Sequence, residues 1–130
     1  MKYIVEGKVI HGKGLGHRHG MPTANLDIEK TDIPFGVYAG IAKVDDTSYY
    51  CVTNVGTRPS VDDSKKMTLE SLLIDFDSNI YGKTLKIELY HFLRPIMKFE
   101  GGIEDVKKQL RFDIEAALEY FKKNKIALTY

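Results

Sequence analysis

The spacing of short apolar runs is the feature of this sequence that most limits the fold it can adopt. Runs rich in Val, Ile, Leu, Tyr and Phe are separated by clusters of Asp, Ser, Asn or Gly, and they cover residues 3–10, 37–44, 49–55, 69–76 and 84–92. The first run alternates apolar and polar side chains, as a half-buried strand does. Short strands at this spacing predict a mainly β chain that forms a sandwich or a barrel, with Asp45-Asp46 as a hairpin tip.

The last quarter of the chain changes to a helical period. Its acidic residues come first and its basic residues last, which suits the dipole of a helix at about residues 102–124. We expect this helix to pack against the β structure of about residues 1–99. Residues that recur at three- and four-residue spacings would form its apolar stripe, and they are Ile103, Val106, Leu110, Ile114, Ala117, Leu118 and Phe121.

Length and charge narrow the class of protein further. A chain of 130 residues has the size of one domain, which we place at residues 1–130. The formal net charge of +1 offers no electrostatic footprint for nucleic acid or an acidic membrane surface. No apolar stretch is long enough to span a bilayer, no secretion signal is visible, and the lone Cys51 suits a buried free thiol. We therefore expect a cytoplasmic protein that binds neither membrane nor nucleic acid.

A glycine-rich segment follows the first run and is a candidate for contact with phosphate. Its glycines lie among basic residues, and they are Gly12, Gly14, Gly16 and Gly20. Glycine adopts left-handed conformations and exposes backbone N–H groups, which a loop that folds over polyphosphate requires. On glycine content alone, however, a flexible surface loop is the commoner explanation.

The residues after this segment offer oxygen ligands for a metal ion. Because Pro22 favours extended backbone, the Thr23 hydroxyl and the Asn25 amide would lie on the same side of the chain. Magnesium prefers oxygen ligands, and neutral ones suffice when a nucleotide supplies the negative charge. The alternative is a turn in which Thr23 and Asn25 cap backbone groups, and the residues alone favour that turn.

Short motifs along the chain resemble, in their order and spacing, those of the riboflavin kinase family. They are GKVIHGKGLG (7–16), PTAN (22–25), PFGVYAG (34–40), NVGTRP (54–59), LES (69–71), FDSNIYGK (76–83), FLRP (92–95) and the closing helix. The resemblance covers nearly the whole chain. It implies the family fold, which is a six-stranded antiparallel Greek-key β-barrel with a C-terminal α-helix packed against it.

The resemblance also implies an activity and assigns roles to residues. The family enzyme uses Mg²⁺ or another divalent metal to transfer the γ-phosphate of ATP to the ribityl 5′-hydroxyl of riboflavin, giving FMN and ADP. By position, Thr23 and Asn25 would hold the metal and the phosphates, and Glu70 would be the catalytic base. Arg94 would bind flavin, although a structural salt bridge explains it equally well. The other implied nucleotide-binding positions are Gly12, Gly14, Gly16, His17, Arg18, Gly20 and Pro22.

The implied base would share its strand face with apolar side chains. In LESLLIDF, alternation places Glu70 on one face with Leu72 and Ile74. An acid there either points into a site or lies on an exposed strand, and without the resemblance the exposed strand is favoured. Asp75 and Asp77 lie near a turn, where capping or solvation explains them better than catalysis.

Three positions depart from the family pattern and keep other functions open. The loop arginine is displaced by one in residues 16–20, Leu72 replaces a residue that is commonly polar, and Ile96 stands where glutamate is frequent. The first alternative is therefore a flavin-binding or regulatory module that has lost turnover. A nucleic-acid-binding barrel is the weaker alternative, because no Arg/Lys stripe is present. In most bacteria the family domain is the C-terminal half of a bifunctional FAD synthetase, so we expect FAD synthesis to lie outside this chain.

Overall fold

The computed structural model describes residues 3–9, 23–28, 32–57, 67–75, 82–97 and 101–128. Six strands and one helix make up this part of the chain. In chain order they are β1 (Tyr3–Lys8), β2 (Thr23–Ile28), β3 (Gly36–Val44), β4 (Thr47–Thr57), β5 (Met67–Leu73), β6 (Thr84–Arg94) and α2 (Ile103–Lys123). The predicted runs therefore correspond to strands, and the predicted C-terminal helix is present.

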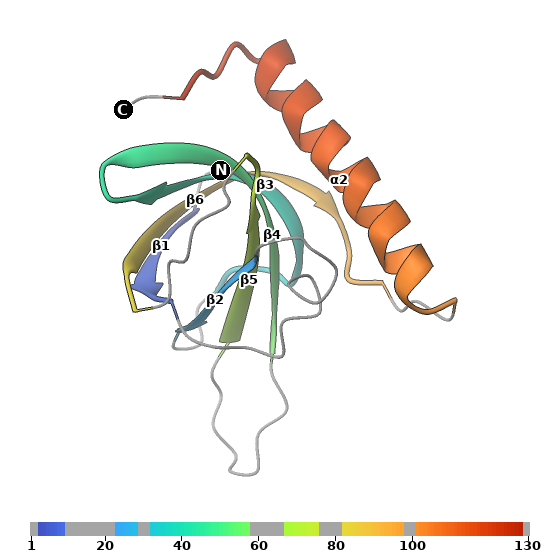
Figure 1. Cartoon of the computed structure of the whole chain (residues 1–130), viewed down its shortest axis with the longest axis horizontal. Helices are drawn as coiled ribbons and strands as arrows, with labels where there is room; N and C mark the ends of the chain where they lie inside the picture. The colour runs from blue at the N-terminus through green and yellow to red at the C-terminus, as the bar shows by residue number, and fades with distance from the viewer. Residues whose placement is uncertain are drawn as a thin grey trace.

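All six strands belong to one antiparallel sheet, in the order β1-β6-β3-β4-β5-β2. β3, β4 and β5 are consecutive neighbours, and β6 returns to lie beside β3, which is the Greek-key arrangement. The sheet curls strongly, so that its edge strands β1 and β2 come into contact (Figure 1). The predicted mainly β fold with six antiparallel strands is confirmed, and the sheet forms a curled half-barrel.

Alternation along the strands divides the side chains between an inner and an outer face of the curled sheet. In β5, for example, Met67, Leu69 and Leu73 lie in the inner core, where burying each contributes about 1.5–3 kcal/mol. The few polar groups inside are paired, since the hydroxyls of Thr53 and Ser71 lie 2.9 Å apart. The inner face is thus closed, and the positions between these residues point to the outer face.

The hairpin between β3 and β4 has the predicted tip. Asp45 and Asp46 have φ angles of 50° and 65°, and Val44 pairs directly with Thr47. Two consecutive residues with positive φ form the turn whose twist suits a two-residue hairpin.

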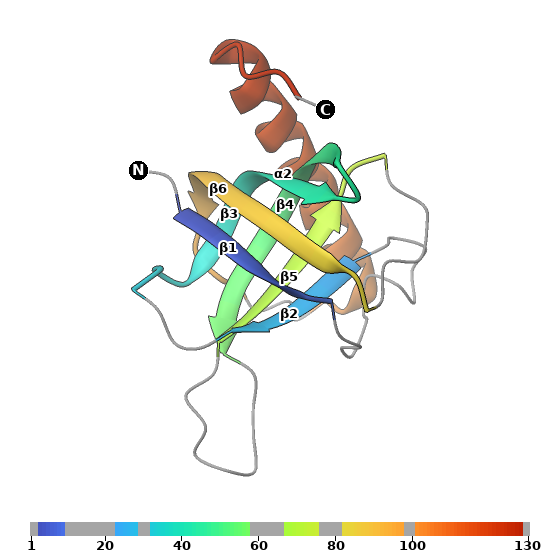
Figure 2. The same cartoon turned by 90° about the vertical axis from the view of Figure 1, so that its left-hand side faces the viewer.

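The helix α2 lies along the outer face of the sheet, and the second view places it behind the strands (Figure 2). Its second half is anchored by Ala117 and Phe121, which are buried with Val37, Ala39 and Val52 of the sheet. The ring of Phe121 stacks on Tyr50 at a centroid distance of 4.6 Å. One member of the predicted stripe was placed wrongly, because Leu118 lies to the side of the contact and is 37% exposed. Among the described residues, no helix combines the length and apolarity needed to cross a membrane.

Candidate active site

A groove lies between the outer face of the sheet and the first half of α2. Its volume is about 220 Å³, several times the roughly 30 Å³ that one water molecule occupies in the liquid, so it admits an organic group. Strands β2 to β6, the segment after β6, and α2 all contribute to its walls. The lining residues are Thr23, Val37, Val52, Asn54, Glu70, Leu72, Arg94, Ile96, Met97, Val106, Leu110 and Asp113.

The strand register places three predicted site residues on one face at the polar end of the groove, which Thr23 and Glu70 line. Asn25 of β2 pairs with Glu70 of β5, and Glu70 pairs on its other side with Asn54 of β4. Thr23 lies two residues before Asn25 and therefore on the same face, paired with Leu72. Directly paired side chains on one face of an antiparallel sheet lie close enough to interact. The extended conformation predicted for this segment is thus confirmed, and the turn alternative is excluded.

The Thr23 hydroxyl is the feature of this end that most clearly indicates a ligand. Among the side chains that the structure describes, its Oγ1 is the only buried polar atom without a hydrogen-bond partner. Leaving such a group unpaired costs about 1–3 kcal/mol, so a folded chain retains it where something else supplies the partner. Asn25, next to it on the strand face, is only 5% exposed. These neutral oxygen donors suit Mg²⁺ that also binds phosphate oxygens.

No part of the described chain gathers three or more His, Cys, Asp or Glu side chains into a group that could hold a metal ion. A metal at the polar end would therefore rely on Thr23 and Asn25 together with oxygens of a bound substrate. This donor set suits a hard cation that arrives with phosphate.

Glu70 lies in a half-buried position between its two asparagine neighbours. Burial raises the pKa of its carboxyl group above the usual value, because the charged form loses hydration. A carboxylate with a raised pKa is a stronger proton acceptor than an exposed one. The exposed strand that alternation alone favours is therefore not what the structure has, because Glu70 is half-buried and lines the groove that α2 faces.

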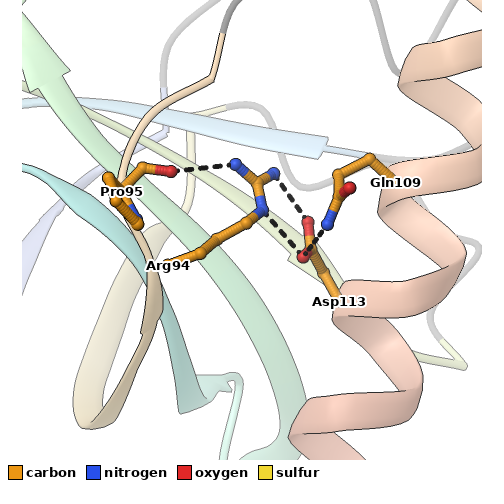
Figure 3. A network of polar contacts seen from close by, with 4 residues as sticks. All are labelled: Arg94, Pro95, Gln109 and Asp113. Atoms are coloured by element: carbon orange, nitrogen blue, oxygen red, sulfur yellow. Dashed lines mark hydrogen bonds and ion pairs between the residues drawn. The ribbon is translucent and has the colours of Figure 1, made fainter.

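Arg94, at the end of β6, is held by the helix on the opposite wall of the groove (Figure 3). Its Nε and Nη2 atoms donate to the two carboxylate oxygens of Asp113 at 2.9 and 2.8 Å. Its Nη1 donates to the backbone oxygen of Pro95 at 3.1 Å, and Gln109 Nε2 donates to Asp113 Oδ1 at 3.0 Å. The salt bridge weighed for Arg94 is thus present, while its side chain also lines the groove.

The sequence did not single out two polar residues of the groove, Asn54 and Asp113. Asn54 lies in the motif NVGTRP, and its position opposite Glu70 becomes visible only from the strand register. Asp113 falls three residues after Leu110 and four before Ala117, which places it on the apolar face of α2. A charged residue on that face is the signal that could have revealed it.

Part of the predicted site falls outside the described residues. These positions are Gly12, Gly14, Gly16, His17, Arg18, Gly20 and Pro22, together with Asp77 near the turn. Asp75 is described, and it is exposed in a turn with φ of 64°, away from the groove. Leu72, one of the departures from the family pattern, is 6% exposed and lines the groove between Thr23 and Val52.

The two ends of the groove differ in chemistry. Thr23, Asn54 and Glu70 make one end polar, and Asn25 lies beside Glu70 on the same strand face. Apart from the paired Arg94 and Asp113, the other lining residues on the sheet and the helix are apolar. Such a groove suits a ligand with a polar tail and a flat apolar body, because each part meets its own environment. The tail would lie where a carboxylate and hard oxygen donors meet.

Comparison with known proteins gives one family. The model of the riboflavin kinase (flavokinase) family matches residues 1–121. A bifunctional riboflavin kinase/FMN adenylyltransferase of Bacillus subtilis (strain 168) is 37% identical over 123 residues, which cover 92% of this chain and 39% of that protein. An RNA-binding riboflavin kinase of the same organism, RibR, is 34% identical over 119 residues, which cover 92% of this chain and 51% of that protein. The chain thus spans about two fifths to one half of these curated relatives.

A solved structure supports the fold independently. The riboflavin kinase from Trypanosoma brucei matches with a TM-score of 0.72 at 19% identity, covering 96% of this chain and 80% of that one. At this identity the likeness concerns the fold alone. Together with the family match over residues 1–121, it leads to one conclusion: the chain belongs to the riboflavin kinase family.

Proposed function

We propose that this chain is a riboflavin kinase that transfers the γ-phosphate of ATP to the ribityl 5′-hydroxyl of riboflavin, giving FMN and ADP. The observation that carries the proposal is the placement of Thr23 and Glu70 on adjacent strands at the polar end of a largely apolar groove, with Asn25 directly beside Glu70 on the same strand face. Membership of the riboflavin kinase family supports it.

The polar end would bind the reacting groups. Thr23 and Asn25 would hold Mg²⁺ and the nucleotide phosphates, and the buried, unpaired hydroxyl of Thr23 supports this assignment. When bound, the metal ion neutralises phosphate charge. The glycine-rich segment of residues 12–20 would cover the phosphates, as the resemblance to the family implies.

Glu70 would act on the substrate hydroxyl. Its carboxylate would orient the hydroxyl and take its proton as the hydroxyl oxygen bonds to the γ-phosphorus and the bond from phosphorus to the leaving ADP oxygen breaks. The raised pKa of this carboxyl group favours the role, because it makes the carboxylate a better proton acceptor. Positioning and charge stabilisation supply most of the remaining acceleration.

The apolar walls would take the isoalloxazine ring. Val52 and Leu72 face the groove from the sheet, and Val106 and Leu110 face it from α2. Both faces of a flat ring between two such walls are removed from water, and burying this apolar surface is favourable. The ribityl chain would then extend toward Glu70, with Arg94 at the side of the groove.

The test is riboflavin-dependent formation of ADP in the presence of ATP and Mg²⁺, with FMN identified as the product. We expect both products in equal amounts. Binding of riboflavin, measured by fluorescence quenching, without any ADP would instead support a flavin-binding module that has lost turnover. The buried Leu72 in the groove, at a position that is commonly polar in the family, is the observation that favours this second candidate.

Other activities in the names of the relatives are outside the proposal. Adenylyl transfer is printed for a protein of which this chain covers 39%, and RNA binding for one of which it covers 51%. The net charge of +1 gives no support for binding RNA. A salt titration of oligonucleotide binding checks this, and we expect no affinity that falls steeply with salt.

A further inference from the structure

The two halves of α2 are attached to the molecule in different ways. The second half is fixed by buried apolar contacts through Ala117 and Phe121, with Ile114 packed against the same cluster. The first half contributes Val106 and Leu110 to the groove, and both are only partly buried. The first half therefore forms one wall of an open cavity, and packing against the sheet does not fix its distance from the opposite wall.

The Arg94–Asp113 pair lies where these two halves meet. Arg94 ends β6, and Asp113 lies between the anchored half of the helix and the half that faces the groove. Both side chains line the groove, and the two bonds between them connect its sheet wall to its helix wall (Figure 3). The separation of the walls at this point is therefore set by the fork of a guanidinium on a carboxylate, which allows one geometry.

A contribution to stability does not by itself explain the buried Arg94–Asp113 ion pair. The side chains of Arg94 and Asp113 are 18% and 4% exposed, so forming the pair requires the removal of water from both charges. Replacing a buried ion pair with apolar residues of similar volume is often neutral or stabilising. What the pair provides, and apolar residues would not, is a fixed direction and distance between the two walls.

Three of the five N–H donors of Arg94 are used within the protein, two by Asp113 and one by the Pro95 oxygen. Asp113 in turn accepts from Gln109, one turn earlier on the helix. This bond within the helix orients the carboxylate toward the guanidinium. A change at Asp113 would release Arg94 and, with it, the connection between α2 and β6.

We propose that Asp113 is a positioning residue for the flavin: by holding Arg94 and the first half of α2 in one geometry, it sets the width of the groove and thereby the affinity for the planar ring. It takes no part in phosphoryl transfer. The inference rests on the proposed function, because it assigns the ring to the apolar part of this groove.

The first test is steady-state kinetics of Asp113→Asn. We expect the KM for riboflavin to rise about 10- to 100-fold, the usual effect of a misplaced binding wall, while kcat at saturating riboflavin and the KM for ATP stay near the wild-type values. A purely structural role would lower the melting temperature without changing the KM of the folded enzyme. A wild-type KM for riboflavin, or a loss confined to kcat, would overturn the inference.

The second test asks whether Asp113 acts through Arg94. In the Arg94→Met background, adding Asp113→Asn should raise the KM no further, because the interaction is already absent. An equal rise in both backgrounds would mean that Asp113 acts independently, which contradicts the proposal. Asp45→Asn is the matched control, since it breaks an exposed ion pair with Lys83 away from the groove and should change neither KM.

A third variant covers the case in which Asp113→Asn does not fold. Arg94→Met with Asp113→Leu removes both charges, so we expect it to fold with a melting temperature close to that of the wild type. A raised KM in this folded variant supports the inference, and a wild-type KM overturns it. The wild-type enzyme decides the proposed function separately, because failure to form FMN there refutes the kinase assignment. Fluorescence titration of riboflavin still compares the affinities of the variants in that case.

Discussion

At the scale of single residues, the buried Thr23 hydroxyl lowers the stability of the fold because it has no hydrogen-bond partner among the described residues, and a bound ligand would supply that partner. We predict that Thr23→Val leaves the free energy of unfolding unchanged or raises it by up to about 1–3 kcal/mol, because a buried donor without a partner is removed. Valine has nearly the same shape and suits a strand. Turnover should nevertheless fall sharply, and half-maximal activity should require more Mg²⁺. Urea denaturation and a magnesium titration of FMN formation measure the two effects, and wild-type kinetics across that titration would refute the metal assignment.

Glu70 should separate binding from chemistry. Glu70→Gln keeps the size of the side chain but removes the proton acceptor, so FMN formation should fall by about two to four orders of magnitude. Riboflavin affinity, measured by fluorescence quenching, should stay close to that of the wild type. Asp75→Asn is the control, because Asp75 is exposed in a turn outside the groove. A larger loss in the Asp75 variant would remove Glu70 as the proposed base.

The sequence motifs identified these residues, but the sequence could not predict their burial or the residues that surround them in space. Extended backbone places Thr23 and Asn25 on one side, and that inference needs only local geometry. The groove that Glu70 lines depends instead on α2, which begins more than thirty residues later and forms the opposite wall. The Arg94–Asp113 pair joins a strand to a helix across space, so the sequence shows only its trace, a charge on the apolar face of α2.

At the scale of elements, the β3–β4 hairpin carries strain that a substitution can relieve. Asp46 has φ of 65°, a region in which L-residues are disfavoured and glycine is not. We predict that Asp46→Gly raises the free energy of unfolding by about 0.5–1 kcal/mol, measured by urea denaturation. Thr47→Gly, at the first residue of β4, should destabilise the protein instead. Equal effects of the two glycines would show that the turn geometry is not responsible.

The elements that the sequence predicted best are those with a regular period. The alternation of β1 and the three- and four-residue spacing of α2 identify them directly. The strand β2, TANLDI, was anticipated only as a short extended segment around Thr23 and Asn25. Its identity as a strand comes from pairing with β5, which is a long-range contact. Leu118 was misplaced because three- and four-residue spacings describe a stripe wider than the face that the sheet covers.

At the scale of the whole molecule, ionisable groups buried in the closed inner core should make the free energy of unfolding decrease at alkaline pH. Burial raises the pKa of the Cys51 thiol and, with a contribution from Tyr3, that of the Tyr38 hydroxyl. Both groups are neutral when protonated, so their contribution to stability is fully present below the pKa values of the unfolded chain. As the pH rises further, the unfolded chain releases these protons first, and the free energy of unfolding falls.

The measurement is the free energy of unfolding from urea titrations between neutral pH and pH about 10, near the ordinary tyrosine pKa. We predict that the free energy of unfolding decreases less with rising pH for Cys51→Ala than for the wild type, because the variant has no buried thiol to ionise on unfolding. The slope is compared rather than the absolute stability, since loss of the sulfur also leaves a small cavity. Identical slopes would mean that Cys51 ionises as readily in the folded state as in the unfolded state.

The strand order also has a consequence for how the protein is made. β1 is an edge strand whose sheet neighbour is β6, with Tyr3 opposite Leu89, so most of the chain must leave the ribosome before β1 can pair. Until then, its backbone groups remain open to strands of other nascent chains, which is the usual route to aggregation. Glu6 and Lys8 place opposite charges on the outer face of this strand. Charged side chains disfavour pairing with a foreign apolar edge, so they protect β1 in the interval before β6 is synthesised.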